Sequence, residues 1–200
     1  VVETNAQGCS GSSQSLTISL QGCGLDAEFS ADQTSICEGG TVVFTDLSLG
    51  VTGSTTYSWD FGANATPATA TGAGPHSVTY STAGNSTVSL TITDGASNTE
   101  TKTDYITVNA PPTVTMAALA DVCEDAADFT LTGGLPAGGN YSGTGVSGGD
   151  FSPTTAGTGT HTIVYTYTDV NGCTSSDSTD INVNALPTVT MAALADVCED

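Results

Sequence analysis

Apolar and polar residues alternate along much of the chain with a period of two. Thr and Ser fill most of the positions between apolar residues, as expected for strands with one buried face and one solvated face. Gly, Asn, Asp and Pro separate the alternating runs and mark turns. The pattern predicts an all-β fold. The runs are Val42 and Phe44; Val88, Leu90 and Ile92; Ile106 and Val108; Ile163, Tyr165 and Tyr167; and Ile181 and Val183.

Residues 116–128 (MAALADVCEDAAD) have a composition that favours a helix. The segment comes just after Pro111 and Pro112 and just before a β pattern. We therefore expect it to form a strand, a bend and a short turn.

One phrase occurs twice. Residues 108–125 read VNAPPTVTMAALADVCED, and residues 183–200 repeat it with one change, from Pro111 to Leu186. A repeat at a spacing of 75 residues (183 − 108) predicts a tandem array of small domains. The expected modules are 1–22, the C-terminal hairpin of a preceding module; 23–110; 111–185; and 186–200, the start of the next repeat.

Each complete module, 23–110 and 111–185, has room for about seven strands, which is enough for an immunoglobulin-like sandwich. Such a module is too small for most enzymes. We therefore expect tandem immunoglobulin-like β-sandwiches in an extended array.

The formal net charge is −20, because 21 acidic residues face one basic residue, Lys102. This charge excludes nucleic acid and anionic lipid surfaces as partners, since both need clustered Lys and Arg. Neighbouring modules of the same chain, surface glycans and other cells remain as candidate partners. No apolar run approaches the roughly eighteen residues that span a bilayer, so we expect no membrane insertion in these residues.

The six cysteines form neither a C-x-x-C zinc pattern nor a Cys/His cluster. Small β modules with few large core residues commonly carry disulfides in oxidising compartments. The sequence therefore predicts an extracellular protein.

Residues 26–108 resemble the PKD domain, an extracellular seven-stranded sandwich. The resemblance lies in YSWDFG (57–62) and PHSVTYSTAGNSTVSLTITD (75–94). The chain departs from the family at GANATPAT (62–69), where the family usually has Gly-Asp-Gly.

Residues 131–173 resemble the immunoglobulin-like repeats of giant surface adhesins from gliding and biofilm-forming Bacteroidota. That resemblance implies export by the type IX secretion system and a location on the cell surface.

Two functions follow from these patterns. The leading hypothesis is a structural stalk or filament segment of a large secreted adhesin, used in attachment or gliding motility. The alternative is a set of non-catalytic accessory modules beside a secreted hydrolase that degrades polysaccharide or protein. Near-identical repeats favour the first, because an enzyme usually carries a few divergent accessory modules.

The chain is not expected to be an enzyme. His76 and His161 open strand-like segments without an acid or nucleophile at catalytic spacing, and no H-E-x-x-H motif occurs. Trp59 is interpreted as a core residue.

Two further sites are candidates. Asp121, Glu124, Asp125 and Asp128 could share a calcium ion, although a solvated acidic turn is the other reading of the same residues. Asp177-Ser178-Thr179 resembles the acceptor motif for O-linked glycans in Bacteroidota, with Ser178 as the acceptor.

Cysteine positions allow two disulfide schemes. In a seven-stranded sandwich, Cys37 lies at the pole where its module ends, and Cys173 lies in a hairpin at the pole where its module begins. These poles are about 17–20 Å apart within one module, whereas a disulfide needs Cα atoms within about 7 Å. The preferred scheme therefore joins Cys37 to Cys173 between modules.

The preferred scheme leaves Cys9 and Cys23 to pair with the upstream module, and Cys123 and Cys198 to pair downstream. The competing scheme joins Cys23 to Cys37 and Cys123 to Cys173.

Overall fold

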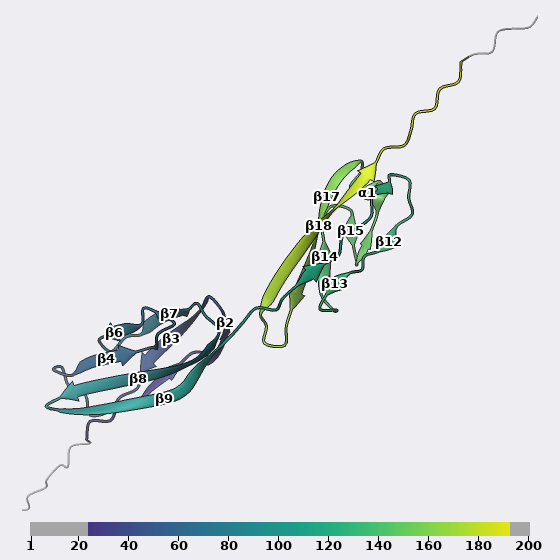
Figure 1. Cartoon of the computed structure of the whole chain (residues 1–200). Coiled ribbons are helices and arrows are strands. Elements are labelled where there is room, and N and C mark those ends of the chain that lie inside the picture. The colour runs from purple at the N-terminus through teal and green to yellow at the C-terminus, as the bar shows by residue number, and fades with distance from the viewer. Residues whose placement is uncertain (1–23, 193–200) are drawn as a thin grey trace, which may run out of the picture.

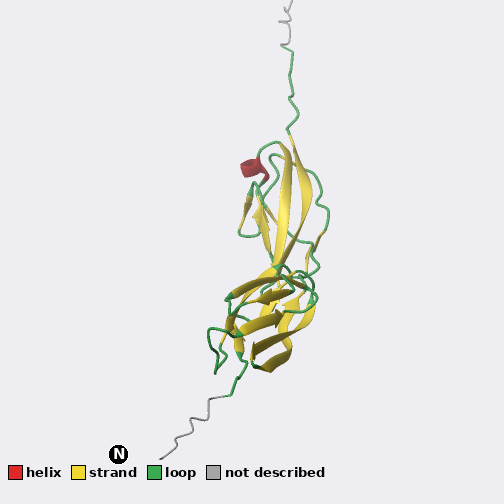
Figure 2. Cartoon of the chain, turned by 90° about the vertical axis from the view of Figure 1, so that its left-hand side faces the viewer, coloured by secondary structure: helices red, strands yellow, loops and turns green. Residues whose placement is uncertain are grey.

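The computed structural model describes residues 24–192, which form two β-sandwiches joined by a short linker (Figure 1). One hydrophobic core draws on residues 27–108 and the other on residues 116–183. The two sandwiches, called the first and second modules below, lie end to end in both Figure 1 and Figure 2. The all-β prediction is confirmed.

The first module is a sandwich of a four-stranded and a five-stranded sheet. The four-stranded sheet has the order β1 (Phe29–Ala31), β3 (Gly40–Asp46), β7 (His76–Tyr80), β5 (Ala65–Thr66). The five-stranded sheet has the order β2 (Ser35–Cys37), β9 (Ala96–Asn109), β8 (Gly84–Asp94), β4 (Thr56–Asp60), β6 (Thr69–Thr71). Most pairs are antiparallel, and β2 with β9 is parallel.

Aromatic side chains fill the centre of the first module. Phe29, Phe44 and Phe61 are fully buried and surround Trp59, which is 1% exposed. The rings of Phe29 and Trp59 meet edge to face at a centroid distance of 5.4 Å, an arrangement that adds to the gain from burial. The prediction that Trp59 is a core residue is confirmed.

Tyr80 closes the same core. Its hydroxyl donates a hydrogen bond to the carbonyl oxygen of Phe61 at 3.1 Å, so the buried polar atom is satisfied. Burial raises the pKa of Tyr80 to about 12, because the charged phenolate is poorly solvated there.

The second module has shorter strands. Its four-stranded sheet has the order β11 (Val122–Cys123), β18 (Thr174–Asn184), β17 (Gly159–Thr168), β14 (Asn140–Ser142). A three-stranded sheet has the order β12 (Phe129–Thr130), β16 (Asp150–Phe151), β15 (Val146–Ser147), and β10 (Thr115–Met116) pairs with β13 (Gly134–Leu135). A one-turn helix, α1 (Pro153–Ala156), follows β16.

The core of the second module is smaller and depends on close backbone packing. Phe151, Ile163 and Ile181 are fully buried, and the rings of Tyr141 and Tyr165 lie 4.7 Å apart. A Cβ atom at Gly134 would lie 2.6 Å from the ring of Tyr165, so only glycine fits there. The glycine-rich sequence of this module therefore makes room for its aromatic residues.

Residues 116–128 contain strand and turn, as predicted, but no bend. The end of β10, all of β11 and a turn lie in this segment. The helix α1 was not predicted, because a four-residue turn is too short to produce a helical periodicity.

We predict that Phe44→Ala will destabilise the first module by about 3–5 kcal/mol, because it leaves a cavity in the aromatic core. Trp59 is the single tryptophan, so its fluorescence reports the unfolding of this module alone. Phe151→Ala is the matched control, and it should leave the tryptophan transition in place. Equal shifts from the two variants would contradict two separate cores.

Candidate functional site: the junction between the modules

A disulfide joins the two modules. It links Cys37, the last residue of β2, to Cys173, which lies in the turn between β17 and β18. The Cα atoms are 5.5 Å apart, whereas the sequence separation is 136 residues. We call this bond the staple.

Parallel pairing of β2 with the end of β9 positions Cys37. The register places Cys37 opposite Asn109, the last residue of β9. The Glu38 amide donates to the Asn109 carbonyl oxygen at 3.0 Å, and the Asn109 side-chain amide donates to the Ile36 carbonyl oxygen at 3.0 Å. Cys37 is therefore held beside the point where the chain leaves the first module.

An aspartate-centred turn positions Cys173. Oδ1 of Asp169 accepts hydrogen bonds from the amides of Asn171 and Cys173, both at 2.9 Å. The Gly172 amide donates to the Asp169 carbonyl oxygen at 3.1 Å. Such aspartate turns fix a short hairpin loop. Cys173 is 1% exposed, so the fixed turn presents its sulfur in a buried setting.

The backbone linker runs beside the staple. Residues 110–114 connect β9 to β10 and include Pro111 and Pro112. The sulfur of Cys173 lies 3.9 Å from the carbonyl oxygen of Asn109. Two covalent connections, one through the linker and one through sulfur, therefore meet at one place between the modules.

The structure joins the pair of cysteines that the strand-pole argument preferred. Because Cys37 is bonded to Cys173, the competing pairs Cys23–Cys37 and Cys123–Cys173 are both wrong. Cys9, Cys23 and Cys198 lie outside the described residues.

Cys123 repeats the setting of Cys37 at the far end of the second module. Its strand β11 pairs in parallel with the end of β18, and Cys123 lies opposite Asn184. The Glu124 amide donates to the Asn184 carbonyl oxygen at 3.0 Å, as Glu38 does to Asn109. Cys123 is exposed and has no disulfide partner among residues 24–192.

The structure does not gather the predicted calcium ligands into one site. Among the described residues, no group of three or more His, Cys, Asp or Glu side chains is placed to hold a metal ion. Asp121 lies just before β11, Glu124 and Asp125 lie in the turn that follows it, and Asp128 lies just before β12. Oδ1 of Asp121 instead accepts a hydrogen bond from the Asn182 amide at 3.3 Å.

Both histidines bond to backbone. Nε2 of His76 lies 3.0 Å from the Gly72 carbonyl oxygen, and Nε2 of His161 lies 2.8 Å from the Gly157 carbonyl oxygen. A groove of about 490 Å³ in the second module is lined by glycines, Asn140 and Tyr141 among others. Neither the histidines nor the groove brings an acid, a base and a nucleophile together.

Ser178, the candidate glycan acceptor, lies in the middle of β18 and is exposed. Its amide donates to the side chain of Asp177 at 2.9 Å. The other carboxylate oxygen of Asp177 accepts from the Met116 amide at 2.8 Å. The acceptor role of Ser178 stays a prediction.

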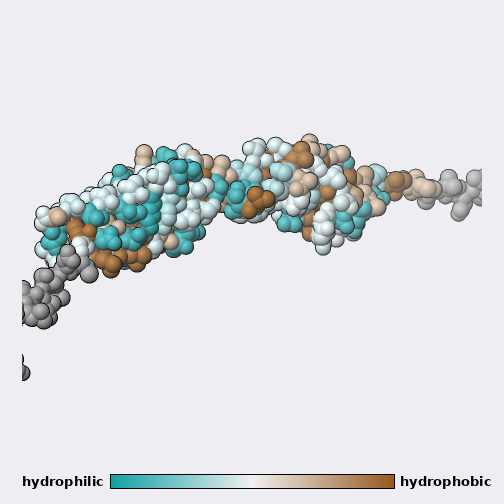
Figure 3. All heavy atoms as spheres, turned by 90° about the horizontal axis from the view of Figure 1, so that it is seen from below, coloured by the Kyte–Doolittle hydropathy of each residue, from teal (hydrophilic) through white to brown (hydrophobic). Residues whose placement is uncertain are grey.

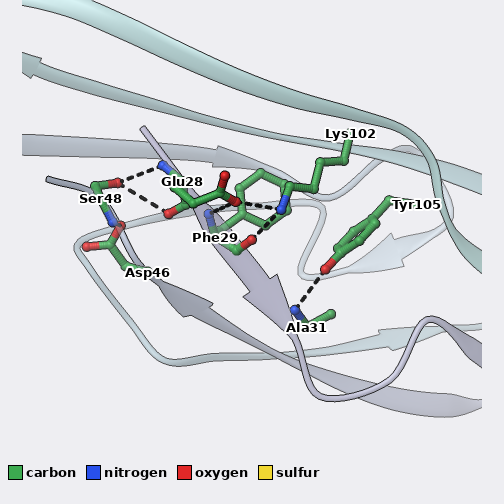
Figure 4. Close-up of polar contacts among 7 residues, drawn as sticks. All are labelled: Glu28, Phe29, Ala31, Asp46, Ser48, Lys102 and Tyr105. Atoms are coloured by element: carbon green, nitrogen blue, oxygen red, sulfur yellow. Dashed lines mark hydrogen bonds and ion pairs between the residues drawn. The ribbon is translucent and has the colours of Figure 1, made fainter. Parts of the chain in front are cut away.

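Sequence reasoning missed the contacts of Lys102, which Figure 4 shows. Its ammonium group donates to Oε1 of Glu28 at 2.6 Å and to the Phe29 carbonyl oxygen at 2.5 Å. The same group lies 4.6 Å from the ring centroid of Phe29 and 5.2 Å from that of Tyr105, within range of cation–π attraction. The hydrogen bond from Lys102 lowers the pKa of the Glu28 carboxyl.

Comparison with known proteins identifies the type of module. Residues 26–108 match the family model for the PKD domain. No curated protein matches the chain. Modules of this type are typical of structural and adhesion proteins, and no catalytic family is identified.

Two solved structures are similar to the chain at 14% identity. The fibronectin(III)-like modules of Clostridium thermocellum CbhA give a TM-score of 0.33 over 83% of this chain and 100% of that chain. The insect immune protein hemolin gives 0.36 over 80% of this chain and 48% of that chain.

A disulfide and a PKD match are both typical of extracellular domains. Within residues 24–192, no helix is long and apolar enough to cross a bilayer.

We predict that replacing Cys37 and Cys173 together by serine will destabilise the second module by about 2–4 kcal/mol. The staple restricts the unfolded chain by closing a long loop, and its loss restores that conformational freedom. Denaturant unfolding followed by tyrosine near-ultraviolet dichroism, which reports both modules, would measure the change when compared with the fluorescence of Trp59, which reports the first module. Cys123→Ser is the control, because that thiol is exposed and unbonded; unchanged unfolding in the double variant would contradict the prediction.

Proposed function

We propose that this chain is a stiff spacer, a stalk or filament segment of a large secreted adhesin on the cell surface. The doubly connected junction between the modules carries the proposal. A spacer needs modules that lie end to end and junctions that resist bending. The end-to-end arrangement and the two covalent connections at the junction support this role.

The junction restricts motion in two ways. Pro111 and Pro112 reduce the freedom of the linker, because proline fixes the φ angle. A flexible linker alone would still let the modules swing and twist about one another. The staple adds a second attachment beside the first, so independent rotation of the two modules is largely removed.

The surface agrees with a spacer that stays soluble as it is extended. The net charge of −20 keeps chains apart by mutual repulsion. In Figure 3, the face shown is mostly pale or teal, and its brown patches are small and separate. Export by the type IX secretion system and a part in gliding belong to the same proposal and are supported by sequence resemblance.

The same junction can be repeated along an array. Cys123 stands in the setting of Cys37, and Cys198 occupies the matching position in the repeated phrase. We assign Cys123 and Cys198 to staples with the modules that follow, and Cys9 and Cys23 to staples with the module before. The modules proposed are those of the sequence analysis, 23–110 and 111–185, with 1–22 and 186–200 belonging to their neighbours.

We predict that the two modules tumble as one body while the staple is intact. Residual dipolar couplings from each module should then fit a single alignment tensor. In a variant with Cys37 and Cys173 both replaced by serine, the modules should give two tensors of different magnitude, because the linker alone permits swinging. Two tensors in the oxidised protein would overturn the spacer proposal, and Cys123→Ser serves as the control.

We also predict that Cys123 forms the next staple. Residues 186–200 repeat 111–125, so appending a copy of residues 126–185 after Asp200 completes a further module with its own hairpin cysteine. Peptide mapping without reductant should find Cys123 bonded to that added cysteine. Replacing the added cysteine by serine should leave Cys123 free to react with a thiol reagent, and a bond from Cys198 to the added cysteine would contradict the repeat.

A further inference from the structure

We propose that the staple is a tension bypass. It carries force from the first module to the second without pulling on residues 38–172, which lie between the two cysteines. The inference rests on the spacer function, because only a chain under tension has use for it. It follows from where the two cysteines lie along the chain and from the contacts of the segment that precedes Cys37.

Tension follows the shortest covalent path. A chain pulled at its ends transmits force along residues 24–37, across the sulfur atoms, and onward from Cys173. The chain between the two cysteines, which are 136 residues apart in sequence, therefore forms a loop closed by the disulfide. Residues 38–172 cannot be extended while the disulfide is intact.

In the second module the force runs along one strand. Cys173 directly precedes β18, and β18 ends at Asn184, where the chain leaves the module. A strand is already close to fully extended, so a pull on both its ends passes through its backbone and adds almost no length. The ten-residue pairing of β18 with β17 is then not pulled apart.

In the first module the force falls on residues 24–37. This segment holds only two short strands, β1 and β2, with three residues each. Backbone pairing of β1 with β3 covers Phe29 to Ala31, pairing of β2 with β9 covers Ser35 to Cys37, and an isolated bridge joins Asp26 to Leu49. So little pairing leaves this segment as the weakest part of the path.

Side chains of β9 reinforce this segment across the gap between the two sheets. Oδ1 of Asn98 accepts from the Ala27 amide at 3.0 Å, and the Tyr105 hydroxyl accepts from the Ala31 amide at 3.0 Å.

Between these two contacts, Lys102 donates to the Phe29 carbonyl oxygen at 2.5 Å and pairs with Glu28 (Figure 4). We call Asn98, Lys102 and Tyr105 the β9 latch.

The latch bonds the backbone of every second residue from Ala27 to Ala31. Ala27, Phe29 and Ala31 alternate along β1 and its approach, so the three contacts run in a line along the direction of pull. Lys102 is the single basic residue of the chain, and its side chain is 25% exposed. Partial burial limits screening by water, which strengthens its charge-assisted bonds over those of a surface pair.

Single-molecule force spectroscopy on the full chain tests the bypass. The chain is tethered at its termini, and Cys9, Cys23, Cys123 and Cys198 are replaced by serine to prevent other crosslinks. Reduction of the staple should add roughly 450–490 Å to the total unfolding length, since each of the 136 residues contributes about 3.3–3.6 Å. The same unfolding length with and without reductant would overturn the proposal.

The latch is tested in the oxidised chain. Lys102→Met keeps the apolar stem but removes the donor, and it should lower the force at which residues 24–37 are released. Thr99→Val is the matched control on β9, because its hydroxyl bonds Thr91 inside the closed loop. Equal release forces in the two variants would overturn the role of the latch.

The two proposals can fail separately. A chain with the shortened unfolding length but with independently aligned modules would retain the bypass and overturn the stiff spacer. A chain with one alignment tensor but the full unfolding length in its oxidised form would retain the stiff spacer and overturn the bypass.

Discussion

The parallel pairing of a short early strand with the end of the last strand governs the whole arrangement. In the first module this pairing sets Cys37 beside Asn109, where the backbone leaves. Three residue pairs between β2 and β9 are enough to fix this arrangement, because side-chain and main-chain hydrogen bonds of Asn109 hold the register. A register shifted by one residue would turn Cys37 to the other face of the sheet, and no staple could form.

The sequence predicted the fold class and the disulfide geometry for the same reason. Alternation at Val88, Leu90 and Ile92 established long strands, and strand length made a bond between opposite poles of one module too long. The acidic residues after β10 allowed two readings, a calcium site and a solvated acidic turn. Carboxylates close in sequence spread around a turn, and nothing in their spacing required them to converge.

The β9 latch was not predictable from the same alternation. Asn98 and Lys102 pair with Ile92 and Val88, so they lie on the inner face of their sheet where an apolar residue would be expected. Tyr105 is three positions from Lys102 and would normally face the other way. A register shift opposite Thr87, with Asp104 at a φ of 50°, brings it to the same side. Such a bulge leaves no periodic signal in sequence.

The second module carries both halves of a joint within its own residues. One half is Cys123, which lies opposite Asn184 as Cys37 lies opposite Asn109 in the first module, and the other is Cys173 in the hairpin turn. On the proposed assignment of Cys123 to the next staple, duplicating such a unit in the gene duplicates a joint with it. The reach of the protein can lengthen or shorten by unequal recombination, with no compensating change elsewhere in the chain.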